Sequence, residues 1–249
     1  MPRMDTMEVS NIQGMQQFQF SAVRIAHLTA TEYTLVTIAI DVTGSTAPFA
    51  DQLRQCLITA VEACKKSPRS NNLLLRVILF STKFQSKGVE EVHGFKPLGE
   101  IDPNAYPQFS PTGGTPLYDA TFSGVGATHE LSAKMMKQDY LVNAICFVIT
   151  DGEDNSSAMT PAQIQSEIKR AHQKEEIESL IGIVVGINAS SCQYSLEHFC
   201  KESGLKYIDA GDVTKGKLAK LAEFVSQSVS SQSQALGTGG PSKAISATI

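Results

Sequence analysis

Predominantly apolar runs that are rich in β-branched residues recur along the chain, separated by segments with helical periodicity. Such runs are typical of strands buried on both faces of a parallel sheet. The four strongest are residues 36–40, 73–80, 143–150 and 180–187. We expect a shorter strand at 206–209, and a more polar edge strand at 89–95 that pairs as a hairpin with the run before it.

The segments between these runs carry apolar residues every three or four positions, together with signals that begin helices. Thr160 and Gln163 have the form of a capping box, with Pro161 at the first helical position. Thr115 before Pro116 carries a similar start signal. Helices are therefore expected at residues 46–66, from 115 onwards, and at 160–178, 195–203 and 218–229.

This alternation of strands and helices predicts an α/β fold with a doubly wound, Rossmann-like sheet. The sheet should be mostly parallel, with one antiparallel edge strand and helices on both faces. We expect the domain to span residues 34–229. Residues 1–33 form an N-terminal extension, loose over about the first 17 residues, although the alternating pattern at 18–22 allows an added strand. Residues 230–249 are expected to form a flexible polar tail.

Composition narrows the functional classes. The chain has 249 residues, of which 42% are hydrophobic, enough for one substantial core. The net charge of −4 gives no electrostatic basis for nucleic-acid binding. No run of 18 apolar residues predicts a membrane span, and the polar N-terminus lacks the apolar middle of a signal peptide. Five scattered cysteines without a Cys-x-x-Cys pair favour neither a disulfide framework nor zinc. We therefore expect a cytoplasmic protein.

Three separated segments place oxygen-bearing side chains where predicted strands or loops end. Asp41 and Asp151 each follow a strongly apolar strand, Thr43 and Ser45 follow Asp41 at spacings of two and four, and Thr115 lies in another loop. Ligands of open α/β sheets bind at the carboxyl ends of strands. If the two strands are neighbours, their carboxylates repel each other unless a cation lies between them. An all-oxygen set of this kind suits Mg²⁺ or Mn²⁺.

Each segment also has a plain structural interpretation. Ser45 or Thr46 could cap the helix that follows, Thr115 could cap the helix at Pro116, and Asp151 could belong to an ordinary turn. All three interpretations would have to hold at once, so the metal site is the stronger hypothesis. Capping and metal ligation are also compatible with each other.

Groups suited to acid–base catalysis do not accompany these segments. The five histidines fall elsewhere, at positions 27, 93, 129, 172 and 198. We expect the nearer carboxylates Asp119, Glu153 and Asp154 to be solvated loop or helix-start groups, with a stronger local negative potential as the second interpretation. An open position on the metal would accept water or a carboxylate from a partner, which is chemistry for reversible binding.

The three segments together resemble the metal-ion-dependent adhesion site (MIDAS) of the von Willebrand factor A (VWA) domain family. The family pattern is Asp-x-Ser-x-Ser after the first strand, a Thr in a middle loop and Asp-Gly after the fourth strand. Here Asp41, Thr43 and Ser45 match the first part, with Thr in place of the first Ser. Thr115 in Gly-Gly-Thr-Pro matches the second part, and Asp151 in Thr-Asp-Gly matches the third. The resemblance covers roughly residues 34–229.

The resemblance implies a specific function for these residues. Thr43, Ser45 and Thr115 would contact Mg²⁺ directly, and Asp41 and Asp151 would act directly or through water. The family implies a non-enzymatic protein–protein interaction module whose metal accepts a Glu or Asp side chain from a protein partner. It also implies a mainly parallel sheet with an antiparallel edge strand. The intracellular prokaryotic members are the type that this chain is most similar to, and no nucleic-acid or membrane partner is expected.

A different class remains as the alternative. The segment that begins at Asp41 also resembles the Asp-x-Thr-Gly-Thr motif of haloacid-dehalogenase-type phosphotransferases, in which a strand-end Asp is the nucleophile. Ser81 would then imitate the second motif of that family, and Asp151 and Asp154 would imitate its Mg²⁺ carboxylates. Against this reading, no Lys lies in a clear third motif, and Thr115 would have no role.

Overall fold

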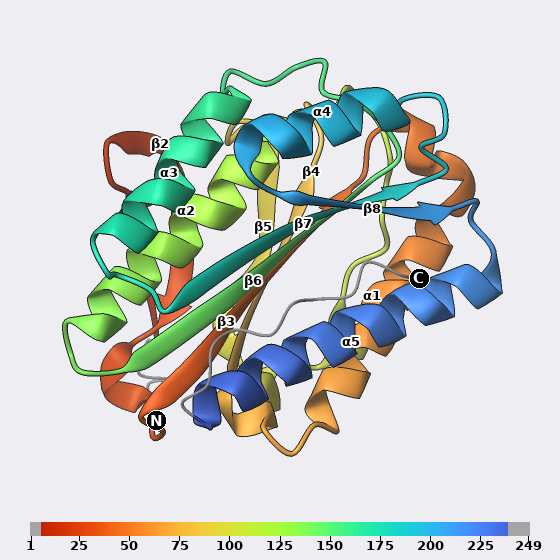
Figure 1. The fold of residues 1–249 in the computed structure, drawn as a ribbon. Coiled ribbons are helices and arrows are strands. Elements are labelled where there is room, and N and C mark those ends of the chain that lie inside the picture. The colour runs from red at the N-terminus through yellow and green to blue at the C-terminus, as the bar shows by residue number, and fades with distance from the viewer. Residues whose placement is uncertain (1–5, 239–249) are drawn as a thin grey trace.

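One eight-stranded sheet, in the order β1-β2-β5-β4-β3-β6-β7-β8, runs through the computed structural model and separates two layers of helices (Figure 1). The structure describes residues 6–238. The strands are β1 (Met7–Ile12), β2 (Met15–Val23), β3 (Glu32–Asp41), β4 (Leu73–Phe80), β5 (Val89–Pro97), β6 (Leu141–Thr150), β7 (Ser179–Ile187) and β8 (Lys206–Gly211). The main helices are α1 (Ala50–Lys65), α2 (Leu117–Met136), α3 (Pro161–Gln173), α4 (Gln193–Ser203) and α5 (Lys215–Gly237).

The central strands are parallel, and the order in which the chain visits them reverses at β3. This strand pairs in parallel with β4 on one side and with β6 on the other, with Asp41 opposite Phe80 and Ile40 opposite Ile149. β5 runs antiparallel to β4. The expected fold class is therefore confirmed, and the carboxyl ends of β3 and β6 meet at the switch point where such sheets bind ligands.

Each face of the sheet carries its own hydrophobic core because side chains alternate along every strand. On β3, Leu35 and Ala39 pack into the core under α2, α3 and α4. Val36, Ile38 and Ile40 pack into the other core, under α1 and α5, and Figure 1 shows these two helices together on one side of the sheet. Burial on both faces explains why this strand is a nearly continuous apolar run.

The N-terminal region differs from its expected loose conformation. β1 and β2 form an antiparallel hairpin with Gly14 at φ +78° in its turn. β2 then pairs in parallel with β5 at Ala22 and Phe95, so β5 is not the outermost strand. Ile12 is buried against α2. The local sequence did not predict this contact, because half of the strand is polar and the partner lies far along the chain. Expectations for residues 1–5 lie outside the described residues.

The C-terminal helix also extends past the expected boundary at residue 229. α5 continues to Gly237, and Gln232 and Ser233 are buried despite their polarity. Asn143 Nδ2 donates to the carbonyl of Gln232 at 2.8 Å, and Arg69 Nε donates to Ser233 Oγ at 3.1 Å. These partners on distant segments make a polar sequence helical to residue 237. The remainder of the expected tail, 239–249, lies outside the described residues.

Helix character and the state of the cysteines can be described across the same residues. Across residues 6–238, every helix falls short of the combination of length and apolar character that a membrane crossing requires. All five cysteines lie in this range and are free thiols, four of them buried.

The capping box at Thr160 and Gln163 is present at the start of α3, and Gly204 ends α4 in the left-handed conformation.

Candidate metal centre

Asp41 lies fully buried at the end of β3. Its Oδ1 accepts a hydrogen bond from the backbone N–H of Thr43 at 2.9 Å, and its Oδ2 accepts one from Thr150 Oγ1 at 2.7 Å. Burial raises the pKa of Asp41 from 3.8 to about 6 because it disfavours the charged form more than these hydrogen bonds and that of the Thr43 hydroxyl favour it. The negative charge of Asp151 raises the pKa further. A cation beside Asp41 would relieve both effects.

A chain of hydroxyl contacts links the Asp41 segment to Asp151. Thr43 Oγ1 lies 3.2 Å from Ser45 Oγ, and Ser45 Oγ donates to Asp151 Oδ1 at 2.8 Å. Burial also raises the pKa of Asp151, while the Ser45 hydrogen bond lowers it. Thus, two hydroxyls and two carboxylates from the ends of β3 and β6 converge on one place.

Thr115 reaches the same place from the loop before α2. The carbonyl of Gly113 accepts from Gly44 N at 3.1 Å, which fixes this loop against the Asp41 segment. Thr115 N donates to Asn155 Oδ1 at 2.8 Å, and Thr115 O accepts from Asn155 N at 3.1 Å. A Cβ placed on Gly152 would lie 3.8 Å from Thr115 Oγ1. The structure therefore brings all five residues of the predicted set together at one edge of the sheet.

The plain capping interpretations are not realised. α2 has Pro116 as its N-cap and no side-chain capping bond, so the hydroxyl of Thr115 does not cap it and Pro116 is not at the first helical position. The chain after Asp41 first forms a 3-10 segment, Gly44–Phe49, and α1 starts at Ala50 without a side-chain cap. Ser45 contacts Asp151 instead. The hydroxyls of Thr115 and Ser45 therefore do not cap helices, and both face the site.

Gly113 occupies a position that a side chain would disturb. Its φ is +78°, and a Cβ there would lie 2.6 Å from Thr82 Oγ1 and 2.8 Å from Ser81 Oγ. Thr82 Oγ1 accepts from Gly114 N at 2.8 Å, so the loop after β4 packs directly on the loop that carries Thr115. This close approach of two loops positions Thr115, and it requires glycine.

Gly113→Ala is therefore expected to destabilise the protein by about 1–2 kcal/mol, since alanine is strained in the left-handed region and the loops must separate. The measurement is denaturant unfolding at equilibrium. Gly99→Ala is the matched control because Gly99 has ordinary backbone angles and open space around its Cβ position. Equal stability of the two variants would show that the Gly113 contact does not position this loop.

Three neighbouring polar residues have roles that the sequence did not reveal. Asp119 is buried and accepts the backbone N–H groups of Ala158 and Met159, at 3.1 and 2.8 Å. Asp154 Oδ1 accepts the N–H of Tyr118 at 3.2 Å, and Asn155 holds Thr115. Hence Asp119 is a buried anchor between α2 and the 152–159 loop, and not the solvated carboxylate that we expected. Asp154 is partly exposed and hydrogen-bonded to the start of α2, and Glu153 is exposed, as expected.

The same geometry bears on the phosphotransferase alternative. Ser81 is fully buried, and its hydroxyl donates to the carbonyl of Thr112. The carboxylate of Asp154 accepts the N–H of Tyr118 at the start of α2. Both carboxylate oxygens of Asp41 are engaged and buried, whereas a nucleophile must reach its substrate. The arrangement of these residues gives no support to Asp41 as a phosphate acceptor.

Solved structures share this fold across most of the chain. The PilB minor pilin of Streptococcus sanguinis matches with a TM-score of 0.59 and 13% identity over 89% of this chain and 66% of its own. The pilus adhesin SpaC of Lactobacillus rhamnosus GG matches with a TM-score of 0.55 and 12% identity over 86% of this chain and 31% of its own. The sequence itself matches no family model and no curated protein.

A von Willebrand factor type A protein from Catenulispora acidiphila matches over 90% of this chain, with a TM-score of 0.51 and 14% identity. This chain therefore has a VWA-like fold. At these identities the comparison shows the fold alone. This chain spans 49% of the Catenulispora protein, 31% of SpaC and 66% of PilB.

Proposed function

We propose that this protein is a non-enzymatic interaction module with one Mg²⁺ at the carboxyl ends of β3 and β6. The observation that carries the proposal is the chain of contacts from Thr43 through Ser45 to Asp151, beside the buried carboxylate of Asp41. Burial raises the pKa values of both carboxylates, so a cation between them would stabilise their ionised forms. The all-oxygen donor set fits Mg²⁺ or Mn²⁺.

Residue roles in this proposal follow from how each oxygen is engaged. The hydroxyls of Thr43, Ser45 and Thr115 would hold the metal directly. Asp41 already accepts from Thr43 N and Thr150 Oγ1, so it would act mainly by charge and through water. Asp151, which is partly exposed, would complete the negative side of the site. When bound, the metal supplies a Lewis-acidic position for one more oxygen ligand.

The partner would present a Glu or Asp side chain to this metal. Ser45 and Gly113 are exposed, and Gly152 is partly exposed, so a protruding side chain can approach from solvent. Two protein carboxylates balance a dication, and a third from the partner is favoured by the hard-oxygen preference of Mg²⁺. The fold similarity to a VWA protein and to a pilus adhesin supports an interaction role.

Acetate, the minimal analogue of an acidic side chain, provides the test. With Mg²⁺ present, acetate should shift the ¹⁵N amide resonances of Gly44, Gly113 and Gly152, and EDTA should abolish the shifts. Acetamide, a neutral isostere, should have no such effect. Thr115→Ala is expected to weaken acetate binding at least tenfold, while Thr112→Ala, an exposed hydroxyl in the same loop, should not. Equal shifts with Mg²⁺ and with EDTA would contradict the mechanism.

A further inference from the structure

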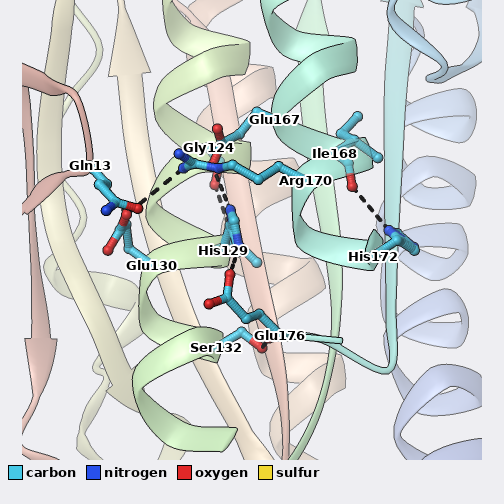
Figure 2. A network of polar contacts seen from close by, with 11 residues as sticks. Gln13, Gly124, His129, Glu130, Ser132, Glu167, Ile168, Arg170, His172 and Glu176 are labelled. Carbon is cyan, nitrogen blue, oxygen red and sulfur yellow. Dashed lines mark hydrogen bonds and ion pairs between the residues drawn. The ribbon is translucent and has the colours of Figure 1, made fainter. Parts of the chain in front are cut away.

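His129 lies buried on α2 between two glutamates from different elements (Figure 2). Its Nδ1 is 2.6 Å from Glu167 Oε1 on α3, and its Nε2 is 2.8 Å from Glu176 Oε2, in the connection between α3 and β7. An ionised carboxylate only accepts hydrogen bonds, so both contacts require an N–H on the ring. Only the doubly protonated imidazolium donates from both nitrogens at once.

The surroundings of His129 favour this charged form. Burial alone would lower the pKa of His129, but the hydrogen bonds to Glu167 and Glu176 raise it above the ordinary 6.5. The positive charge of Arg170, which pairs with Glu167 at 2.8 Å, repels the imidazolium and lowers the pKa of His129 in turn. The charged groups around His129 and the neighbouring surface hollow are Glu130 and Lys134 on α2, Lys137 just after it, Glu167 and Arg170 on α3, and Glu176 in the connection. From the hairpin, the N–H of Gln13 donates to Glu130 at 2.9 Å, and Glu8 lies 3.9 Å from Lys134.

The two glutamates would respond differently to loss of the proton. The Glu167 side chain is 8% exposed and is also held by Arg170, whereas that of Glu176 is 20% exposed and reaches solvent. A neutral imidazole has one N–H left to donate. Glu167 keeps a donor in Arg170, but as the more buried carboxylate it loses more than Glu176 when the N–H of His129 is withdrawn, because water can replace that N–H only at Glu176. Glu176 is therefore the partner that separates and turns to water.

Glu176 holds a strained part of the backbone in place. The preceding residue, Glu175, has φ +54°, a left-handed conformation that is unfavourable for a residue with a side chain. The segment is fixed by Glu176 at three points: its carboxylate on His129, its carbonyl, which accepts from Ser132 Oγ at 2.6 Å, and its N–H, which donates to the carbonyl of Ala171 at 3.1 Å. One of these three points depends on a titrating group.

We propose that protonated His129 latches the α3–β7 connection, residues 174–178, onto α2, and that loss of the proton releases this connection. His129 and Glu176 line a surface hollow of about 330 Å³ between α2 and the N-terminal hairpin, and release opens this hollow. The connection lies at the amino ends of the parallel strands, where Glu178 N donates to Val142 O at 2.8 Å. The latch is thus at the opposite edge of the sheet from Asp41 and does not rest on the metal proposal.

Hydrogen exchange of the full chain, measured in EDTA and read as protection factors at pH 6 and pH 9, tests the latch. Protection of residues 174–178 should fall on the order of tenfold at the higher pH, as expected for loss of one hydrogen bond to a charged group. Protection of β4 should not change. In ¹⁵N NMR spectra the His129 ring should titrate above 6.5.

Two variants separate the titrating anchor from the fixed one. His129→Gln should lose the pH dependence and show low protection of residues 174–178 at both pH values. Ser132→Ala removes the non-titrating anchor of the same residue, so protection should fall at both pH values while the tenfold ratio remains. If His129→Gln does not fold, Glu176→Gln should lower the pKa of His129 and abolish the ratio. The latch is overturned if the protection of residues 174–178 in the wild type does not depend on pH. It is also overturned if a folded His129→Gln or Glu176→Gln variant shows the same tenfold ratio as the wild type.

Discussion

Asp41→Asn is expected to make the metal-free protein more stable at pH 7.5 and to abolish its stabilisation by Mg²⁺. The folded-state pKa of Asp41 is about 6, against an ordinary value of 3.8. A difference of this size corresponds to about 2–3 kcal/mol of destabilisation by the ionised carboxylate. Asparagine fills the same space and keeps an oxygen acceptor for Thr43 N. Mg²⁺ at 100 times its dissociation constant should stabilise the wild type by about 2.7 kcal/mol and leave the variant unchanged.

The same shift fixes the sign of the pH dependence without metal. Because the folded state binds a proton at Asp41 more tightly than the unfolded state, the contribution of Asp41 is fully present below pH 3.8 and is lost as pH rises through about 6. Urea unfolding in EDTA, compared between wild type and Asp41→Asn at each pH, isolates this group from other carboxylates. The exposed Asp51→Asn serves as the control. Equal gains from Mg²⁺ in wild type and Asp41→Asn would refute the assigned metal position.

Asp119→Ala is expected to lower the free energy of unfolding by about 2–4 kcal/mol because two backbone N–H groups lose their acceptor. These groups belong to Ala158 and Met159, and Met159 is buried. For a chain of this size the melting temperature should fall by roughly 5–15 °C in thermal unfolding. Mg²⁺ affinity, measured by calorimetry, should fall as well, since the same loop carries Asn155, which holds Thr115.

Asp119→Asn separates the hydrogen bonds from the charge. Its amide retains one oxygen acceptor, so the loss of stability should be less than half that of Asp119→Ala. If both variants were within 0.5 kcal/mol of the wild type, roughly the range of neutral surface changes, the 152–159 loop would be held by other contacts. A stability loss in Asp119→Ala with unchanged Mg²⁺ affinity would show that Asn155 positions Thr115 independently of this anchor.

Local sequence was sufficient for the central strands and for the proximity of the five proposed metal-site residues. Asp41 and Asp151 end apolar strands, and such strand ends gather at one edge of a parallel sheet, so the strand pattern alone places the two carboxylates near each other. The spacing from Asp41 to Ser45 is short enough for one turn to place both side chains. The apolar run predicted β4 at its observed bounds, Leu73–Phe80. A strand that is buried on both faces needs apolar residues at nearly every position, and such a run is typical of a central strand.

Hydroxyl groups were the difficult case, because one serine or threonine can satisfy several competing partners. The sequence could not decide whether Thr115 caps α2 or faces Asp151, since both roles require the same side chain at the same position. Tertiary contacts decided it: Asn155 binds both the N–H and the carbonyl of Thr115 and leaves the hydroxyl free of the helix end. The buried role of Asp119 was hidden for the same reason, as its partners are 39 and 40 residues away.

The sequence by itself determined the doubly wound sheet and the placement of five oxygen-bearing side chains at the carboxyl ends of its strands, because these depend on periodicity and on residues close in the chain. Only the tertiary structure decided that the N-terminal hairpin extends the sheet, that α5 continues to Gly237 and that His129 lies between Glu167 and Glu176. Each of these depends on partners from distant segments. A polar residue is stabilised in the interior by where its partner lies, and that position is a property of the folded chain.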